Sequence, residues 1–135
     1  MLFSELQVGQ SAEFTKTVTE SDVVMYAGIT GDFNPMHVNE EYARQTQFGG
    51  RIAHGMLTAG FISAVLGMKL PGEGSIYLNQ TLRFTKPVRI GDTVTARIEV
   101  IELFPEKKRV RLATTCRNQN DEKVLDGEAL VLMQA

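Results

Sequence analysis

The sequence predicts an α+β domain in which one long, curled antiparallel sheet of about five strands wraps around a central apolar helix. Three observations lead to this prediction. Apolar residues recur mostly at helical spacing in residues 19–70, and they recur at every second position in residues 75–133. The segment from Gly55 to Leu70 is apolar or small at nearly every position. A helix that is apolar on every side must be covered on every side, and a curled sheet can provide that cover.

A strand over about residues 12–18 opens the chain, and two short helices follow it. Thr19 and Asp22 have the spacing of a capping box, which predicts that the first helix begins there. Asn39 is a good N-cap for the second helix, which we expect to continue through the sequence EYARQT. The Gly49-Gly50-Arg51 segment after it predicts a flexible loop.

The third helix is the long apolar one. Apolar residues recur at helical spacing at Leu57, Phe61, Ala64 or Val65, and Met68, and Pro71-Gly72 ends the segment. The segment is shorter than the roughly 20 residues that a membrane span needs. We therefore expect a helix buried inside the protein and no contact with a membrane.

The period of two predicts strands over residues 75–84, 92–103 and 108–118, and a hairpin at residues 118–121 leads into a last strand over about 123–133. Each strand should present one apolar face, namely Ile76, Leu78, Leu82 and Phe84; Val94, Ala96, Ile98 and Val100; and Val110, Leu112, Thr114 and Cys116. Five strands cannot close around a helix, so edges stay exposed. Pairing of two subunits along one edge would cover it, and we therefore expect a symmetric homodimer.

Composition narrows the function classes. The 135 residues are 43% hydrophobic and 22% charged, which is ordinary for one globular domain, here residues 1–135. A formal net charge of −2 gives no bias toward nucleic acid. The only cysteine, Cys116, cannot form an internal disulfide, and the first ten residues lack the pattern of a signal peptide. We therefore expect a cytoplasmic protein.

Residues 31–39 carry the most informative pattern. Asp32 and His37 stand five residues apart across an Asn34-Pro35 turn, and the proline makes that turn rigid. A carboxylate and an imidazole that converge can hold one water molecule and move protons to and from it. Two alternatives stay open from the residues alone: a purely structural turn, or a metal site completed by His54.

The second pattern is the start of the apolar helix at His54 and Gly55. Backbone N–H groups at a helix N-terminus lack partners, and a glycine there lets a carbonyl oxygen approach, so an oxyanion hole is expected. Taken alone, His54 and the mid-helix Ser63 are better explained by structural hydrogen bonds than by a role as base or nucleophile. Arg83, Lys86 and Arg89 form either a solvated basic face or a phosphate-binding cluster, as a nucleotide-bearing substrate would need.

Many of these residues belong to a longer pattern, made of Tyr26, Asp32-Phe33-Asn34-Pro35-Met36-His37-Val38-Asn39, Ala43, Phe48 and Ile52-Ala53-His54-Gly55-Met56. This pattern resembles the hydratase-2 motif of the MaoC-like (R)-specific enoyl-CoA hydratases. Later runs around residues 71–78 and 84–92 are similar to the family too, so the resemblance spans nearly the whole chain. It is nearest to the short bacterial hydratases that supply polyhydroxyalkanoate synthesis.

The resemblance implies a hot-dog fold and the reversible hydration of trans-2-enoyl-CoA to (R)-3-hydroxyacyl-CoA, with no metal and no redox cofactor. It implies that Asp32 and His37 form the catalytic pair and that the Gly55 N–H polarises the thioester carbonyl. It also implies a supporting role for Ser63, and it implies that Asn34 positions the loop.

Substrate contacts beyond this set are expected at His54 and along the apolar helix. Val65 and Leu66 are candidates to set the depth of the acyl pocket. Three alternatives stay open: a hot-dog acyl-CoA thioesterase, a dehydratase of branched or dicarboxylic hydroxyacyl-CoA, and a non-catalytic acyl-CoA-binding subunit.

Overall fold

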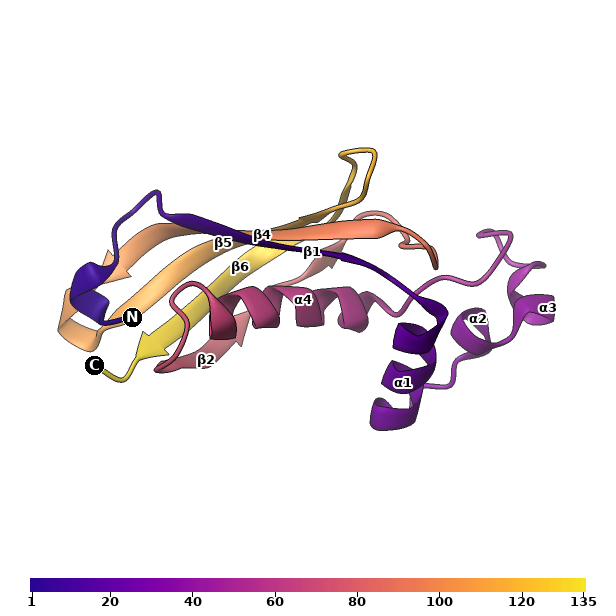
Figure 1. The fold of residues 1–135 in the computed structure, drawn as a ribbon, viewed down its shortest axis with the longest axis horizontal. Helices are drawn as coiled ribbons and strands as arrows, with labels where there is room; N and C mark the ends of the chain where they lie inside the picture. The colour runs from indigo at the N-terminus through magenta and orange to yellow at the C-terminus, as the bar shows by residue number, and fades with distance from the viewer.

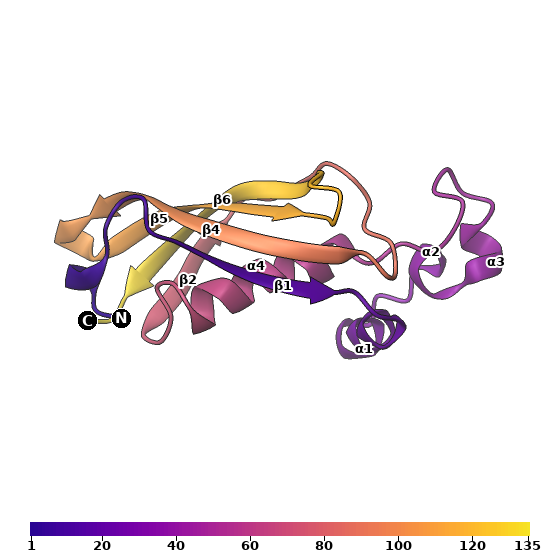
Figure 2. The same ribbon diagram turned by 45° about the horizontal axis from the view of Figure 1, so that its top comes forward.

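The structure, a computed structural model, describes all of residues 1–135. In chain order the elements are η1 (Phe3–Glu5), β1 (Ser11–Thr17), α1 (Glu20–Thr30), α2 (Pro35–Val38), α3 (Glu40–Ala43), α4 (Gly55–Met68), β2 (Ser75–Gln80), β3 (Arg83–Phe84), β4 (Thr93–Phe104), η2 (Pro105–Lys107), β5 (Arg109–Arg117) and β6 (Lys123–Met133). Helix α4 runs along one face of the curved sheet (Figure 1). Helices α1, α2 and α3 lie together beyond the end of the sheet where α4 begins, as Figure 2 also shows.

All strand pairs are antiparallel, in the order β1-β4-β5-β6-β2, and β3 also pairs with β6. The sheet therefore has six strands and not about five. The strand predicted over residues 75–84 is divided because Thr81 leaves the ladder between β2 and β3. Its N–H donates to the Glu128 carbonyl at 2.9 Å, and its hydroxyl accepts from the Glu128 N–H at 2.9 Å.

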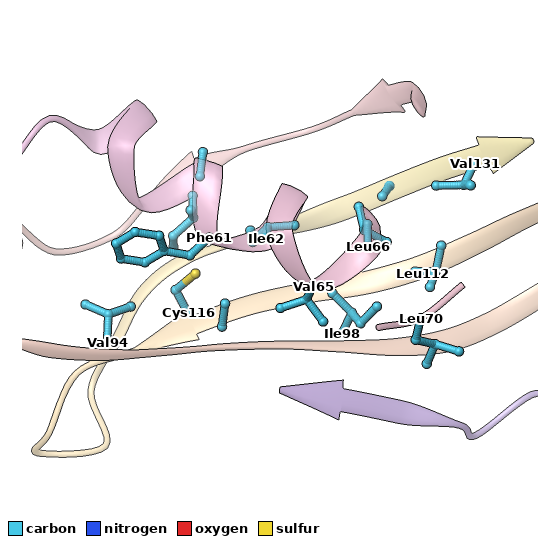
Figure 3. Close-up of a cluster of buried hydrophobic side chains, with 14 of the residues drawn as sticks. Phe61, Ile62, Val65, Leu66, Leu70, Val94, Ile98, Leu112, Cys116 and Val131 are labelled. Carbon is cyan, nitrogen blue, oxygen red and sulfur yellow. The ribbon is translucent and has the colours of Figure 1, made fainter. Parts of the chain in front are cut away.

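The core lies between α4 and the middle of the sheet. The predicted inner faces of β4 and β5 are confirmed, because all eight of their residues are almost completely buried. Figure 3 shows how Phe61, Ile62 and Val65 of α4 point toward these strands. None of the helices combines the length and the apolar character that a membrane span requires.

Two surfaces that the sequence predicts to be buried are open in the single chain. On α4, Met56 and Met68 are 53% and 82% exposed, so the sheet covers one side of this helix and not every side. On β2 and β3, the alternation of residues 75–84 buries no face, since Ile76, Leu78 and Phe84 are all exposed. A single sheet has only one concave face, so both surfaces need cover from elsewhere.

Local signals account for the short helices. The Thr19 hydroxyl accepts from the Asp22 N–H at 3.1 Å, and the Asp22 carboxylate accepts from the Thr19 N–H at 2.9 Å, which confirms the capping box of α1. Asn39 caps α3 as predicted, but α3 ends at Ala43 and does not continue through EYARQT. Helix α2 was not predicted, because four residues are too few to show a helical period.

Candidate active site

Helix α2 positions His37. Its N-terminus is fixed by Asn34, whose side-chain oxygen accepts from the Met36 N–H at 3.1 Å, and by Pro35 in the first turn. The His37 side chain is buried, and its Nδ1 lies 2.8 Å from the Ile52 carbonyl oxygen. A carbonyl oxygen can only accept, so Nδ1 carries the proton and Nε2 keeps a free lone pair.

Burial is the largest influence on the charge of His37, and it lowers the pKa of the imidazole below its usual value. The hydrogen bond to Ile52 and the negative charge of Asp32 act in the opposite direction, whereas the nearby His54 adds to the lowering. The imidazole is therefore neutral near pH 7 and able to accept a proton at Nε2.

Asp32 and His54 complete a three-residue cluster with His37. One donor or acceptor atom from each side chain lies within 4.8 Å of the others. The Asp32 carboxylate accepts from the Asn34 N–H at 3.2 Å and is otherwise exposed at the pocket. Two polar atoms at such a separation can both contact one water molecule at about 2.8 Å, which supports the water-binding pair predicted for Asp32 and His37.

His54 holds the cluster together. It is 2% exposed, and its Nε2 donates to the backbone carbonyl of Asp32 at 3.0 Å. Its ring stacks on that of His37, with centroids 3.9 Å apart and planes 30° apart. The centroid of the Tyr26 ring lies 4.7 Å from the centroid of the His54 ring. The buried Nδ1 has no partner.

The same stacking argues against the metal site. A metal ion bound by imidazole lies close to the plane of each ring, about 2.0–2.1 Å from the nitrogen. The His37 and His54 rings stack with centroids 3.9 Å apart and planes 30° apart. An ion bound to a nitrogen of one ring, and lying in the plane of that ring, would therefore lie well outside the plane of the other ring. The His37 and His54 side chains therefore do not fit a common ion in this arrangement.

Gly55 begins α4 and lies at the wall of a pocket of about 450 Å³, together with Asp32, His37 and His54. As the first residue of the helix it has no intrahelical acceptor for its N–H, and the helix dipole adds partial positive charge. The ring of Phe84 packs against it, and a Cβ added at Gly55 would stand 2.6 Å from Phe84 Cε1. Any larger residue here would require the Phe84 ring or the start of α4 to move.

The basic cluster is only partly at the pocket. Lys86 lines it and forms an ion pair with Glu122. Arg83 pairs with Asp126 at 3.3 Å, and neither Arg83 nor Arg89 lines the pocket.

The remaining predicted residues lie outside the pocket of a single chain. Asn34 is exposed and caps α2, which agrees with a role in positioning the loop. Ser63 is exposed on the open side of α4. Val65 and Leu66 are 0% and 2% exposed in the core, so in the single chain neither borders the pocket.

The roles of Phe84, which lines the pocket, and of Arg51, which lies outside the pocket lining, are not indicated by the sequence. The sequence predicts only a strand face for Phe84 and a flexible loop for Arg51. In the structure Arg51 is anchored, because its guanidinium contacts the His37 carbonyl and the Glu20 carboxylate. No local signal marks this ion pair, since its partners are 31 residues apart.

Comparisons with known proteins agree with this fold. Residues 4–123 match the model of the MaoC like domain. The chain is 56% identical over 133 residues to the (R)-specific enoyl-CoA hydratase of Rhodospirillum rubrum, covering 98% of this chain and 92% of that protein. It is also 56% identical over 131 residues to the 3-hydroxybutyryl-CoA dehydratase of Methylorubrum extorquens, covering 97% and 83%.

Among solved structures, the unliganded R-hydratase PhaJ1 from Pseudomonas aeruginosa superimposes with a TM-score of 0.93 at 49% identity, covering 98% of this chain and 84% of that one. The (R)-hydratase from A. caviae involved in PHA biosynthesis superimposes with a TM-score of 0.92 at 42% identity, covering 95% and 97%. The α+β architecture is therefore the hot-dog fold, and the chain belongs to the MaoC-like domain family.

Proposed function

We propose that this protein catalyses the reversible, (R)-specific hydration of trans-2-enoyl-CoA to (R)-3-hydroxyacyl-CoA. One observation carries the proposal: a neutral imidazole, a carboxylate and a free helix N-terminus converge at one pocket, through His37, Asp32 and Gly55. The relatives named above at 42–56% identity, among them the (R)-specific enoyl-CoA hydratases, support the same reaction.

The pair can perform the proton transfers of this reaction. As the oxygen of the bound water attacks C3, His37 Nε2 takes a proton from that water. The Asp32 carboxylate holds the water. The proton taken by His37 then passes to Asp32, which hands it to C2, so that the atoms of one water molecule are added and the pair returns to its starting state.

Gly55 acts on the charge that develops elsewhere. Conjugate addition moves negative charge to the thioester oxygen, where the Gly55 N–H and the dipole of α4 stabilise it. A preorganised donor of this kind is worth about 3 kcal/mol. The reaction changes no oxidation state, and the chain supplies both the acid–base pair and the oxyanion donor, so we propose that no metal and no redox cofactor is required.

The substrate follows from the same geometry. Lys86, which lines the pocket, would face the phosphates of CoA, whereas contacts of Arg83 and Arg89 with those phosphates remain predictions because neither residue lines the pocket. Roles for Ser63, Val65 and Leu66 in the acyl subsite remain predictions that require cover over the open side of α4.

The buried single cysteine is in keeping with the cytoplasm as the site of action.

Crotonyl-CoA tests the reaction. With purified protein, we expect loss of the conjugated enone absorbance without release of free CoA thiol. Thiol release would favour the thioesterase, and binding of crotonyl-CoA without either change would favour the non-catalytic subunit. Either outcome would overturn the hydratase proposal.

The pH dependence follows from His37. The base must be neutral to accept a proton, and burial lowers its pKa, so protonation requires a lower pH than for an ordinary histidine. We expect the acidic limb of kcat/KM to fall below about 6.5, the usual pKa of histidine. A limb at or above that value, measured with crotonyl-CoA across a pH series, would contradict a neutral buried base.

We further propose a homodimer that forms along the β2 edge. Strand β2 pairs only with β6, so its other edge is free, and it exposes Ile76, Tyr77 and Leu78. The other edge strand of the sheet, β1, is polar on its exposed face. We expect Leu78→Lys to shift the mass in solution from that of a dimer to that of a monomer. The control is Val8→Lys, because Val8 is an exposed apolar residue outside the strands, and this variant should keep the mass of the dimer. A wild-type monomer in sedimentation would refute the dimer.

A further inference from the structure

The structure assigns a positioning role to Arg51. We propose that Arg51, anchored by Glu20, fixes the main chain and thereby the imidazole of His37 for proton transfer. This inference rests on the proposed hydration, but part of its test needs no substrate.

Arg51 connects three segments that are distant in sequence. Its side chain is only 14% exposed. Its Nε donates to the backbone carbonyl of His37 at 2.6 Å, and its Nη1 lies 2.9 and 2.8 Å from the two carboxylate oxygens of Glu20. Glu20 is the first residue of α1, so one guanidinium ties α1, the end of α2 and the segment before α4 together.

The next residue, Ile52, holds the other side of the same histidine. Its N–H donates to the Met36 carbonyl at 3.2 Å, and its carbonyl accepts from His37 Nδ1 at 2.8 Å. Arg51 and Ile52 therefore fix the main chain and the ring of His37 at once. Of these contacts, only the one from Arg51 comes from a side chain that can be changed without altering the histidine.

Helix α2 depends on such support because it has four residues and little internal bonding. If the contact to the His37 carbonyl is lost, the helix end can move and the bond from Nδ1 to Ile52 weakens. The proton can then reside on Nε2 in part of the molecules, and those molecules have no base aimed at the water.

A lysine cannot replace Arg51. The planar guanidinium donates to the His37 carbonyl through Nε and to Glu20 through Nη1, whereas an ammonium group is a single point at the end of the chain. The Arg51 side chain also lies outside the set of residues that line the pocket. Its loss should therefore lower kcat and leave KM nearly unchanged.

The kinetic test uses Arg51→Gln and Arg51→Lys with crotonyl-CoA. We expect both to lower kcat by about 10- to 100-fold, as a misplaced catalytic group does, with KM within about twofold of wild type. Arg44→Gln is the matched control, because Arg44 forms an exposed ion pair with Glu41 on α3. That control should retain wild-type kcat.

The second readout is the tautomer of His37 by ¹⁵N NMR of the imidazole nitrogens. The chain has only two histidines, so His54→Gln assigns the signals. We expect protonated Nδ1 in wild type and Arg44→Gln, and a mixture of tautomers in Arg51→Gln. If Arg51→Gln does not fold, the milder Glu20→Gln is measured in its place, with a smaller change in the same direction.

The outcomes separate the two proposals. Failure of wild type to hydrate enoyl-CoA would refute the proposed function and leave the tautomer result standing. Folded variants at Arg51 or Glu20 with wild-type kcat and an unchanged His37 tautomer would overturn the positioning role. A rise in KM at constant kcat would overturn it as well, because it would indicate a contact with substrate.

Discussion

His37→Gln is expected to lower kcat for hydration by about 10²–10⁴-fold, the usual contribution of a positioned acid or base. Glutamine can still donate to the Ile52 carbonyl, but it has no nitrogen lone pair that accepts a proton near neutral pH. Asp32→Asn should have a similar effect. The new side chain can still accept from the Asn34 N–H, so the turn is retained while the carboxylate is lost.

Both variants require proof of folding, by circular dichroism and thermal unfolding beside wild type. Glu41→Gln provides a matched control on the neighbouring exposed helix α3, where only an ion pair with Arg44 is removed. A folded His37→Gln or Asp32→Asn protein with more than about a tenth of wild-type kcat would exclude that residue from the proton transfers.

Gly55→Ala has the second large effect that we expect. The added Cβ would stand 2.6 Å from Phe84 Cε1 and 2.8 Å from Cδ1, so either the ring or the start of α4 must move. If the helix moves, its N–H is displaced from the thioester oxygen. Loss of one oxyanion donor lowers kcat by about 10²–10³-fold, and we expect an effect of up to that size.

A second substitution separates the two causes. Phe84→Ala removes the ring, so the double variant Gly55→Ala/Phe84→Ala should recover part of the kcat that Gly55→Ala loses. Gly28→Ala in α1 is the control, because no atom lies within 4 Å of an added Cβ there. Wild-type kcat in Gly55→Ala would contradict the prediction, because it would show that the Phe84 ring moves and leaves the N-terminus of α4 in place.

The sequence predicts those elements of the fold that are determined by the types and spacing of neighbouring residues. β4 and β5 are half-buried antiparallel strands, so the alternation of residues 94–100 and 110–116 identified their inner faces. The capping box at Thr19 identified the start of α1. The alternation over residues 75–84 misled, because a register shift after Tyr77 and the departure of Thr81 interrupt the strand.

The candidate site divides in the same way. Asp32, His37 and Gly55 lie in short segments whose turn and helix start can be recognised from neighbouring residues, and the structure brings them to one pocket. The ion pair of Arg51 with Glu20 depends on tertiary structure, so no pattern in the sequence marks it.

The acyl-side residues could not be placed from the sequence for a related reason. Ser63 lies on a side of α4 that nothing in one chain covers. What it contacts depends on the surface that packs there, and a helix that is apolar all round does not reveal which side faces the sheet.

The configuration of the product tests the central claim most directly. Crotonyl-CoA is incubated with the protein, and the 3-hydroxybutyryl-CoA formed is resolved by chiral chromatography after hydrolysis of the thioester. We expect the (R) enantiomer, because one rigid pair, Asp32 and His37, delivers water to a single face of a substrate held at Gly55. The (S) enantiomer, a racemate or no product would contradict it.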